Sequence, residues 1–275
     1  TDMYVYNAGE RLLCFTPPDR AGPLADDWDD KVFIQDVAVR DASGEFAVFG
    51  VHGPTSTETM GTLLAGASVP EEPLTFVRGA IAGAGVTAVS ADDPTGETGY
   101  EVICRADDAD DVWDSLLTRG TPTTPVGYRA WNGLTLEAGT PLFDTELVGR
   151  IPNVAGVRNA LDFEKGCYVG QEVVSRVENQ GRPSKRLVGL HVDAVPESGA
   201  AVMDGDAHVG DVTRGVESPS LDRPIALAYV ESGVPDADPS LTVRVAGADT
   251  DAAVTSLPFV EGSGRSGRLP DYDSD

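Results

Sequence analysis

The residues with the clearest chemical potential lie between Lys165 and Glu172, where the chain reads Lys-Gly-Cys-Tyr-Val-Gly-Gln-Glu. Two glycines flank Cys167 and Tyr168, which predicts a tight turn, because glycine adopts backbone angles that a side chain forbids. The helical spacing of apolar residues over 173–178 predicts a short helix after the turn. A helix N-terminus and a nearby ammonium group both favour a thiolate, so Cys167 is a candidate catalytic residue, with Lys165 and Tyr168 beside it. In the alternative interpretation, Cys167 is a small buried hydrophobe and the glycines only form a turn.

The elements that must position this turn fall into two kinds. Before residue 186 the patterns mix strands and helices: a hairpin over 3–15, strands at 31–37, 46–51 and 95–104, and helices at 57–64, 107–117 and 128–138. From residue 186 onward, short β-prone runs recur between Gly, Pro and Asp, which predicts a small barrel or sandwich. The turn therefore lies between an α+β region and an all-β region.

The two ends of the sequence also predict structure. The chain enters a strand by residue 3 with no lead-in, so we expect the N-terminal part of the first domain to be missing from this sequence. Residues 261–275 are rich in Gly, Ser and Asp, which predicts a disordered tail.

The charge is strongly negative. Forty-five acidic residues face 20 basic ones, for a formal net charge of −25, and only three residues are lysines. The acids are interleaved with apolar segments, so the pattern is that of a folded protein in molar salt, where screening removes most self-repulsion. We therefore expect a halophilic source, an archaeon, and the charge argues against nonspecific binding of nucleic acid or anionic membranes. With no signal peptide and no long apolar run, the expected location is the cytoplasm.

The cysteines and histidines do not predict a metal site. Three cysteines lie far apart, at positions 14, 104 and 167, and the three histidines form no cluster. Neither a disulfide framework nor the ligand spacing of a metal site is visible, so no metal is expected.

Several separated stretches share a resemblance. Lys165–Glu172 resembles the K-G-C-Y-x-G-Q-E signature of the YgfZ family, the folate-binding relatives of the glycine-cleavage T-protein. Three further stretches resemble T-protein motifs: Phe49–Pro54 a strand that ends in a Gly-Pro turn, Thr95–Glu101 the T-G-E-x-G-Y/F-E motif, and Leu134–Gly139 the L-R-L-E-A-G helix. The resemblance extends along nearly the whole chain, to about Phe259.

The resemblance implies a fold and its domains. We expect a GcvT-like folate-binding fold of class α+β, with interleaved α+β domains followed by a small C-terminal β-barrel. Residues 1–36 would end one α+β subdomain, and 37–185 would form the larger α+β domain with the cysteine motif. Residues 186–260 would form the barrel, ahead of the tail at 261–275.

The resemblance also implies a cofactor, tetrahydrofolate or a one-carbon derivative of it. Glu101 matches the family's pterin-binding glutamate, and a carboxylate can accept two hydrogen bonds from the edge of an aminopterin. Tyr100, Asp2 and Arg176 are the other candidate folate contacts. As an isolated residue, Glu101 would more often be a solvated surface acid. In the alternative interpretation, the basic cluster of Arg176, Arg182, Lys185 and Arg186 only balances nearby acids.

Two positions depart from the T-protein pattern. Thr1 stands where the T-protein has its catalytic acid, with Asp2 next to it, and Trp131 stands where T-proteins carry an arginine. The main expectation is therefore a YgfZ-like monomer that supports iron-sulfur cluster assembly or repair, with Cys167 as the functional thiol and iron-sulfur proteins or their assembly factors as partners. The alternatives are a folate-dependent aminomethyltransferase and a folate-binding scaffold without chemistry.

Overall fold

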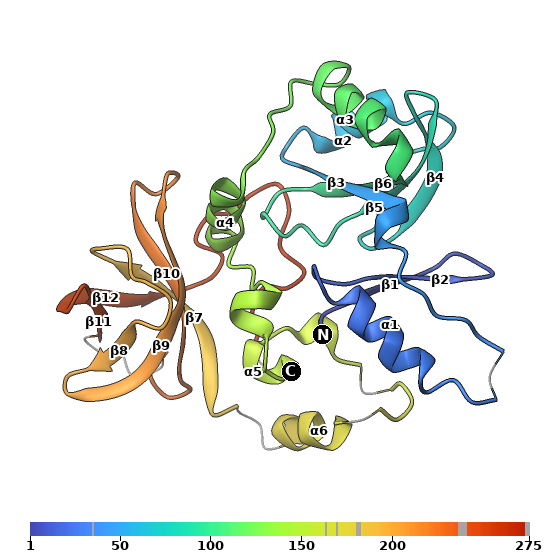
Figure 1. The fold of residues 1–275 in the computed structure, drawn as a ribbon. Coiled ribbons are helices and arrows are strands. Elements are labelled where there is room, and N and C mark those ends of the chain that lie inside the picture. Colours follow the sequence, from blue (N-terminus) through green and yellow to red (C-terminus); the bar gives the residue numbers. More distant parts are fainter. Residues whose placement is uncertain (35, 163, 169, 180–182, 236–240, 273–275) are drawn as a thin grey trace.

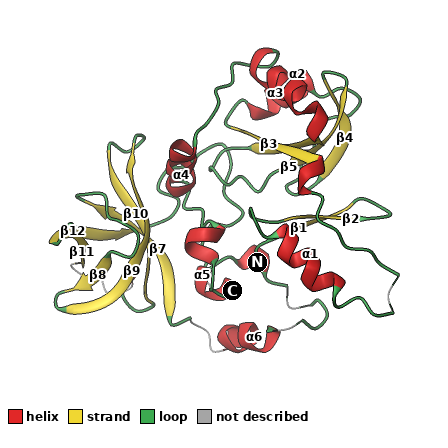
Figure 2. Cartoon of the chain, viewed as in Figure 1, coloured by secondary structure: helices red, strands yellow, loops and turns green. Residues whose placement is uncertain are grey.

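The computed structural model describes residues 1–275 except 35, 163, 169, 180–182, 236–240 and 273–275 (Figure 1). A four-stranded sheet with two helices lies at one end of the molecule and a β-barrel lies to its side. A short N-terminal hairpin and several short helices fill the space between them (Figure 2). In the described part of the chain, no helix is long and apolar enough to cross a lipid bilayer.

The four-stranded sheet is antiparallel, in the order β3-β6-β5-β4. Its strands are β3 (Phe46–His52), β4 (Phe76–Ile81), β5 (Ala84–Ser90) and β6 (Gly99–Arg105). Helices α2 (Ser56–Leu63) and α3 (Ala109–Thr118) pack on one face, over a core that includes Met60, Val102 and Val112. Side chains on successive strand residues point to opposite faces, so every second residue of β3 and β6 faces away from this core.

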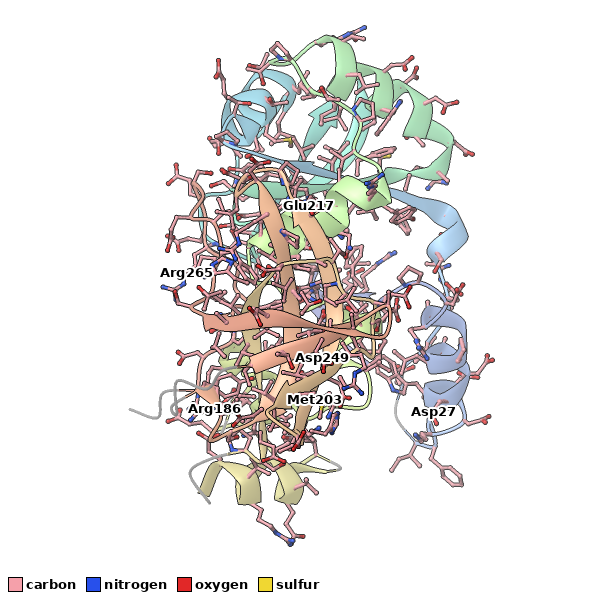
Figure 3. The ribbon with its side chains drawn as sticks, turned by 90° about the vertical axis from the view of Figure 1, so that its left-hand side faces the viewer. Asp27, Arg186, Met203, Glu217, Asp249 and Arg265 are labelled. Carbon is pink, nitrogen blue, oxygen red and sulfur yellow. The ribbon has the colours of Figure 1, made fainter. Side chains whose placement is uncertain are left out.

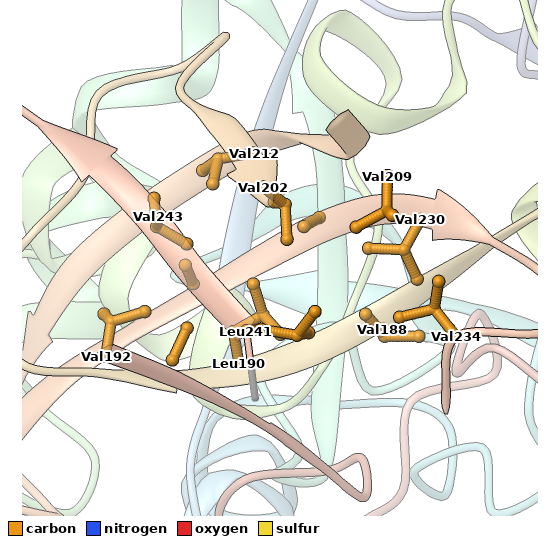
Figure 4. Packing of buried hydrophobic residues seen from close by; sticks show 13 residues of the cluster. Val188, Leu190, Val192, Val202, Val209, Val212, Val230, Val234, Leu241 and Val243 are labelled. Atoms are coloured by element: carbon orange, nitrogen blue, oxygen red, sulfur yellow. The ribbon is translucent and has the colours of Figure 1, made fainter. Parts of the chain in front are cut away.

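The second region is a closed barrel in the strand order β10-β7-β12-β11-β8-β9. Its strands are β7 (Lys185–Val192), β8 (Ala201–Asp204), β9 (Ala207–Ser218), β10 (Arg223–Glu231), β11 (Leu241–Val245) and β12 (Ala248–Thr255). Branched side chains, mostly valine, fill the interior (Figure 4). β-branched residues suit a strand because they pack well on a pleated surface. The predicted fold class, α+β with a C-terminal barrel, is confirmed.

Helix α4 (Tyr128–Glu137) joins the two regions. Arg214 of β9 points at α4 and the following turn, where its Nε donates to Glu146 Oε1 at 2.9 Å. Its other nitrogens donate to Asn132 Oδ1, Thr135 Oγ1 and the Thr140 carbonyl. Both members of the ion pair are buried, with side chains 5% and 0% exposed. This network ties the barrel to the α+β region.

The remaining elements are short. They are β1 (Tyr4–Asn7), β2 (Leu12–Phe15), α1 (Ala21–Asp29), α5 (Pro152–Ala155), α6 (Gln171–Asn179), the 3₁₀ turns Ser43–Glu45, Ala106–Asp108 and Arg158–Ala160, and the π-helical turn Phe143–Leu147. The strand predicted at 31–37 is wrong for the described residues there, which exclude Gln35 and form turns and bends. Phe33 and Ile34 are about nine-tenths exposed, so these two apolar side chains do not pack in a core.

The C-terminal segment 261–272 is an ordered strap, which corrects the prediction of a disordered tail for these residues. The backbone N–H groups of Gly264, Gly267 and Asp271 donate to carbonyls of Gly96, Asp92 and Gly156. The strap runs from the barrel past α4 to the middle of the molecule (Figure 1). A sequence poor in apolar residues is ordered here because distant backbone groups supply its hydrogen-bond partners.

Candidate functional site

Tyr100 and Glu101 are neighbours in β6 but point to opposite faces of the sheet. Tyr100 is buried in the core under α2 and α3, and its hydroxyl lies 2.9 Å from Thr57 Oγ1. Glu101 lies on the other face, which looks toward the middle of the molecule. The structure therefore separates two residues that the sequence placed at one site: Tyr100 packs in the core, and Glu101 lies on the opposite face of the sheet, beside His52.

His52 lies beside Glu101 on the same face. In the β3–β6 register Gly50 pairs with Glu101 and His52 pairs with Gly99. The imidazole covers the two glycines: a Cβ on Gly50 would lie 2.6 Å from Nε2, and a Cβ on Gly99 would overlap Nδ1. The ring also packs against Trp131 of α4, with centroids 5.3 Å apart. The absence of side chains at both glycines is what makes room for the ring.

The electrostatics of this face set the protonation states of its residues. Burial and the charge of Asp92 raise the pKa of Glu101 to about 7. The Glu101 side chain is 36% exposed, so solvent reaches its carboxylate, and we call the surface that it forms with His52, Trp131 and Tyr6 the recess. Burial lowers the pKa of His52 to about 4, so its ring is neutral. Burial, with the charges of Asp92 and Glu101, raises the pKa of Tyr6 to about 12.

A cluster around Arg268 borders the recess. This arginine comes from the C-terminal strap, and it donates to Asp2 Oδ2 at 2.7 Å and to Asp92 Oδ2 at 3.0 Å. The Tyr4 hydroxyl accepts from Arg268 Nε at 2.9 Å and donates to Asp92. The cluster thus joins β1, the loop before β6 and the strap, and it places Asp2 in an ion pair.

The recess suits a flat ligand with N–H groups on its edge. A carboxylate accepts two parallel hydrogen bonds from such an edge, and the pair is stronger when the acceptor is charged. Aromatic rings at the same place, Trp131 beside His52 and Tyr6 near Glu101, offer apolar surface to a flat heterocycle. Tyr6 is held by edge-to-face contacts with Phe15 and Phe76.

The structure does not bring the cysteine turn to this recess. Cys167 is exposed, and α6 begins at Gln171, after Gly170. Lys165 Nζ lies 4.2 Å from the centroid of the Tyr168 ring, and the Tyr168 N–H donates to Gln171 Oε1. Helix α6, which follows the turn, lies at the opposite side of the molecule from the sheet that carries Glu101 (Figure 1). Val169 is outside the described residues.

The basic cluster predicted near the turn is dispersed. Arg176 pairs with Glu172 at 2.8 Å, and both side chains are exposed. Lys185 lies 3.7 Å from Asp211 on the barrel, and Arg182 is outside the described residues. Within the part of the chain that the structure describes, no group of three or more His, Cys, Asp or Glu side chains could hold a metal ion.

Comparison with known proteins gives the family. The profile of the GCVT N-terminal domain matches residues 2–165, and that of the glycine cleavage T-protein C-terminal barrel domain matches 185–261. This chain belongs to the glycine cleavage T-protein family. The two matches leave only the ends of the chain and residues 166–184 outside.

Several similar proteins carry the same name, aminomethyltransferase. The chain is 30% identical over 272 residues to an aminomethyltransferase of Symbiobacterium thermophilum, and 32% identical over 272 residues to one of Halalkalibacterium halodurans. Each match covers 94% of this chain and 72% of the relative. The crystal structure of the glycine cleavage system aminomethyltransferase T from Bartonella henselae superposes with a TM-score of 0.77 at 22% identity, covering 96% of this chain and 72% of that one.

These findings correct the functional expectation. The prediction of a role in iron-sulfur cluster assembly is wrong, because the relatives that match nearly the whole chain are aminomethyltransferases. The narrower YgfZ assignment has no support among these relatives, whereas the T-protein superfamily does. The prediction of tetrahydrofolate as cofactor is confirmed at the level of the family.

Sequence reasoning missed three groups at the recess: His52, Asp92 and the Tyr4–Arg268 pair. His52 lies within the Phe49–Pro54 motif, two residues after Gly50, so its side of the strand could have been predicted from the alternation. Arg268 had no such signal, since it lies in a segment whose composition predicts disorder.

Proposed function

We propose that this protein binds tetrahydrofolate at the recess around Glu101 and acts as an aminomethyltransferase. The observation that carries the proposal is the Glu101 carboxylate itself: solvent reaches it, and aromatic rings lie nearby. The relatives named aminomethyltransferase, similar over 94% of the chain, support the transfer activity.

The fit to the pterin follows from hydrogen-bonding capacity. The pterin edge presents a ring N–H and an exocyclic amino group side by side, and ionised Glu101 supplies two acceptor oxygens. Trp131 offers apolar surface beside the neutral His52 ring. Glu101 orients the ring, and tetrahydrofolate supplies the nitrogen atoms that take up the one-carbon unit.

The transfer needs a partner that carries the aminomethyl group on a thiol. In the balanced reaction, the two folate nitrogens bind the carbon, ammonia leaves, and the carrier thiol is released in its reduced form. Thr1 aligns with the family's catalytic acid, and Arg268 holds both the neighbouring Asp2 and Asp92 in ion pairs.

Two measurements test the proposal. Titration calorimetry with tetrahydrofolate should show binding that Glu101→Gln weakens at least tenfold, whereas Glu58→Gln, an exposed acid on α2, leaves it unchanged. Methylenetetrahydrofolate formation from an aminomethyl-lipoyl carrier should then depend on Glu101. Absence of tetrahydrofolate binding would refute the proposal, and binding without turnover would identify a folate-binding scaffold.

The cysteine turn is a separate part of the proposal. Cys167 would act as a reactive thiol, supported by its exposure and by the Lys165 ammonium at the Tyr168 ring. Cys14 is the control for accessibility, because it is also an exposed free thiol. Thiol labelling at neutral pH should reach Cys167 faster than Cys14. Equal labelling, with full activity in Cys167→Ser, would show that the thiol has no such role.

Asp2 and Arg176 remain proposed folate contacts, and both have an observed salt-bridge partner that the ligand would have to displace or share. The halophilic source, the cytoplasmic location and the monomeric state likewise remain proposals. The halophilic source can be tested by measuring how the stability of the protein depends on salt concentration.

A further inference from the structure

We propose that His52 determines which pteridines the recess accepts, by placing an N–H donor next to the acceptor oxygens of Glu101. This proposal rests on the proposed function and deepens it: a ring with an oxo group at position 4 would be accepted, and a ring with an amino group there would not gain from His52. His52 would thus be a specificity-determining residue.

The geometry brings the two side chains together above one glycine. His52 and Glu101 are diagonal neighbours on adjacent strands. A Cβ on Gly50 would lie 2.6 Å from His52 Nε2 and 3.8 Å from Glu101 Oε1, so both atoms converge over the bare backbone of Gly50. The two atoms are 3.9 Å apart, which is too long for a hydrogen bond. His52 Nε2 and Glu101 Oε1 therefore do not hydrogen-bond to each other, and both can hydrogen-bond to a ligand.

The protonation state makes His52 a donor at this position. Burial holds the pKa of His52 near 4, so at neutral pH the ring carries one proton. Nε2 is the nitrogen nearest Glu101, and the negative carboxylate favours the tautomer with the proton on Nε2. Nδ1 lies buried over Gly99 without a hydrogen-bond partner, and a buried N–H with no acceptor is rarer than an unpaired acceptor. Both considerations place the proton on Nε2.

A donor beside a carboxylate matches the order of groups on a 4-oxo pterin. Along that edge an oxo group is followed by a ring N–H and then by an amino group. Glu101 accepts from the two N–H groups, and the adjacent His52 N–H donates to the oxo oxygen. In a 4-amino pteridine the same place holds an N–H group, so donor would face donor and a buried polar group would lose its partner.

The surrounding residues fix the position of the His52 ring. Gly50 and Gly99 leave space for it on one side, and Trp131 packs on it, with ring planes inclined at 56°. The His52 side chain is 13% exposed, so little freedom remains for another rotamer. A group fixed in this way discriminates better than a mobile one, because it cannot turn to satisfy the wrong ligand.

The experiment compares tetrahydrofolate with its 4-amino analogue by calorimetry on the full chain. His52→Phe keeps a ring over the glycines and removes the donor. It should weaken tetrahydrofolate binding about fivefold to tenfold and, because it removes the donor that faces the 4-amino group, strengthen binding of the analogue several-fold. His191→Phe, a barrel histidine packed on Phe259, is the matched control and should alter neither affinity.

A second variant keeps the inference testable if the phenylalanine does not fold. His52→Gln carries both a donor and an acceptor, so it should bind tetrahydrofolate nearly as the wild type does and bind the 4-amino analogue several-fold more tightly. Equal losses for both ligands in His52→Phe, with no gain for the analogue in His52→Gln, would overturn the role of His52 alone. Failure of the wild type to bind tetrahydrofolate would overturn the proposed function itself.

Discussion

The raised pKa of Glu101 predicts a pH dependence of folate binding with a definite sign. Only the ionised carboxylate accepts both pterin N–H groups, and burial together with Asp92 places its pKa at about 7 in the free protein. The apparent affinity is the intrinsic affinity multiplied by the ionised fraction. Tetrahydrofolate should therefore bind about tenfold more weakly at pH 6 than on the alkaline plateau, and about a hundredfold more weakly at pH 5.

Stability of the free protein should change in the opposite direction. A carboxyl group whose pKa is raised from 4.5 to about 7 on folding binds its proton more tightly in the folded state. Its contribution to stability is therefore present below about pH 4.5 and is lost as the pH rises to about 7. Glu101→Gln removes this titration. The difference between the unfolding temperatures, variant minus wild type, should therefore increase as the pH rises.

Calorimetry and thermal unfolding from pH 5 to 8.5, at one fixed salt concentration, test both statements. Glu101→Gln should bind tetrahydrofolate weakly and with a flat pH profile, while Glu58→Gln should follow the wild type in both measurements. A wild-type affinity that is constant between pH 5 and 8.5 would refute the reasoning. So would a Glu101→Gln profile that still rises tenfold per pH unit.

Three further predictions concern stability. Arg214→Met and Glu146→Gln should each cost about 3–5 kcal/mol in denaturant unfolding, because each leaves a buried charged or polar partner unpaired, and the double variant should cost clearly less than their sum; additive costs would contradict the pairing. Arg268→Ala should cost about 2 kcal/mol and expose the strap to proteolysis, because it leaves Asp2 and Asp92 without their partner. Arg265→Ala, exposed on the same strap (Figure 3), should change neither; equal effects of the two would show that the cluster does not hold the strap. Finally, the net charge of −25 predicts an unfolding temperature that rises from about 0.1 to 1 M KCl, as screening shortens from about 10 to 3 Å; a flat or falling curve would argue against adaptation to salt.

Local sequence patterns predicted several of the strands and helices. The amphipathic spacing around Val112 and Leu116 predicted α3, and the turn-punctuated β runs after residue 186 predicted the barrel. In its described residues the apolar run at 31–37 is not a strand, because β-propensity depends on burial and packing and the side chains of Phe33 and Ile34 are exposed. Tyr100 was misplaced for a different reason: it shares a motif with Glu101 but lies on the other side of the sheet.

The sequence by itself determined the α+β class, the barrel, the strongly acidic surface and Glu101 as the candidate pterin-binding carboxylate, because each rests on local period, composition or a contiguous motif. Only the tertiary structure showed that His52 lies beside that carboxylate and packs on Trp131, that the cysteine turn lies elsewhere and that the strap brings Arg268 to Asp2 and Asp92. Those contacts join residues up to 266 positions apart. No local pattern encodes them, because their energy comes from groups that meet only when the domains pack together.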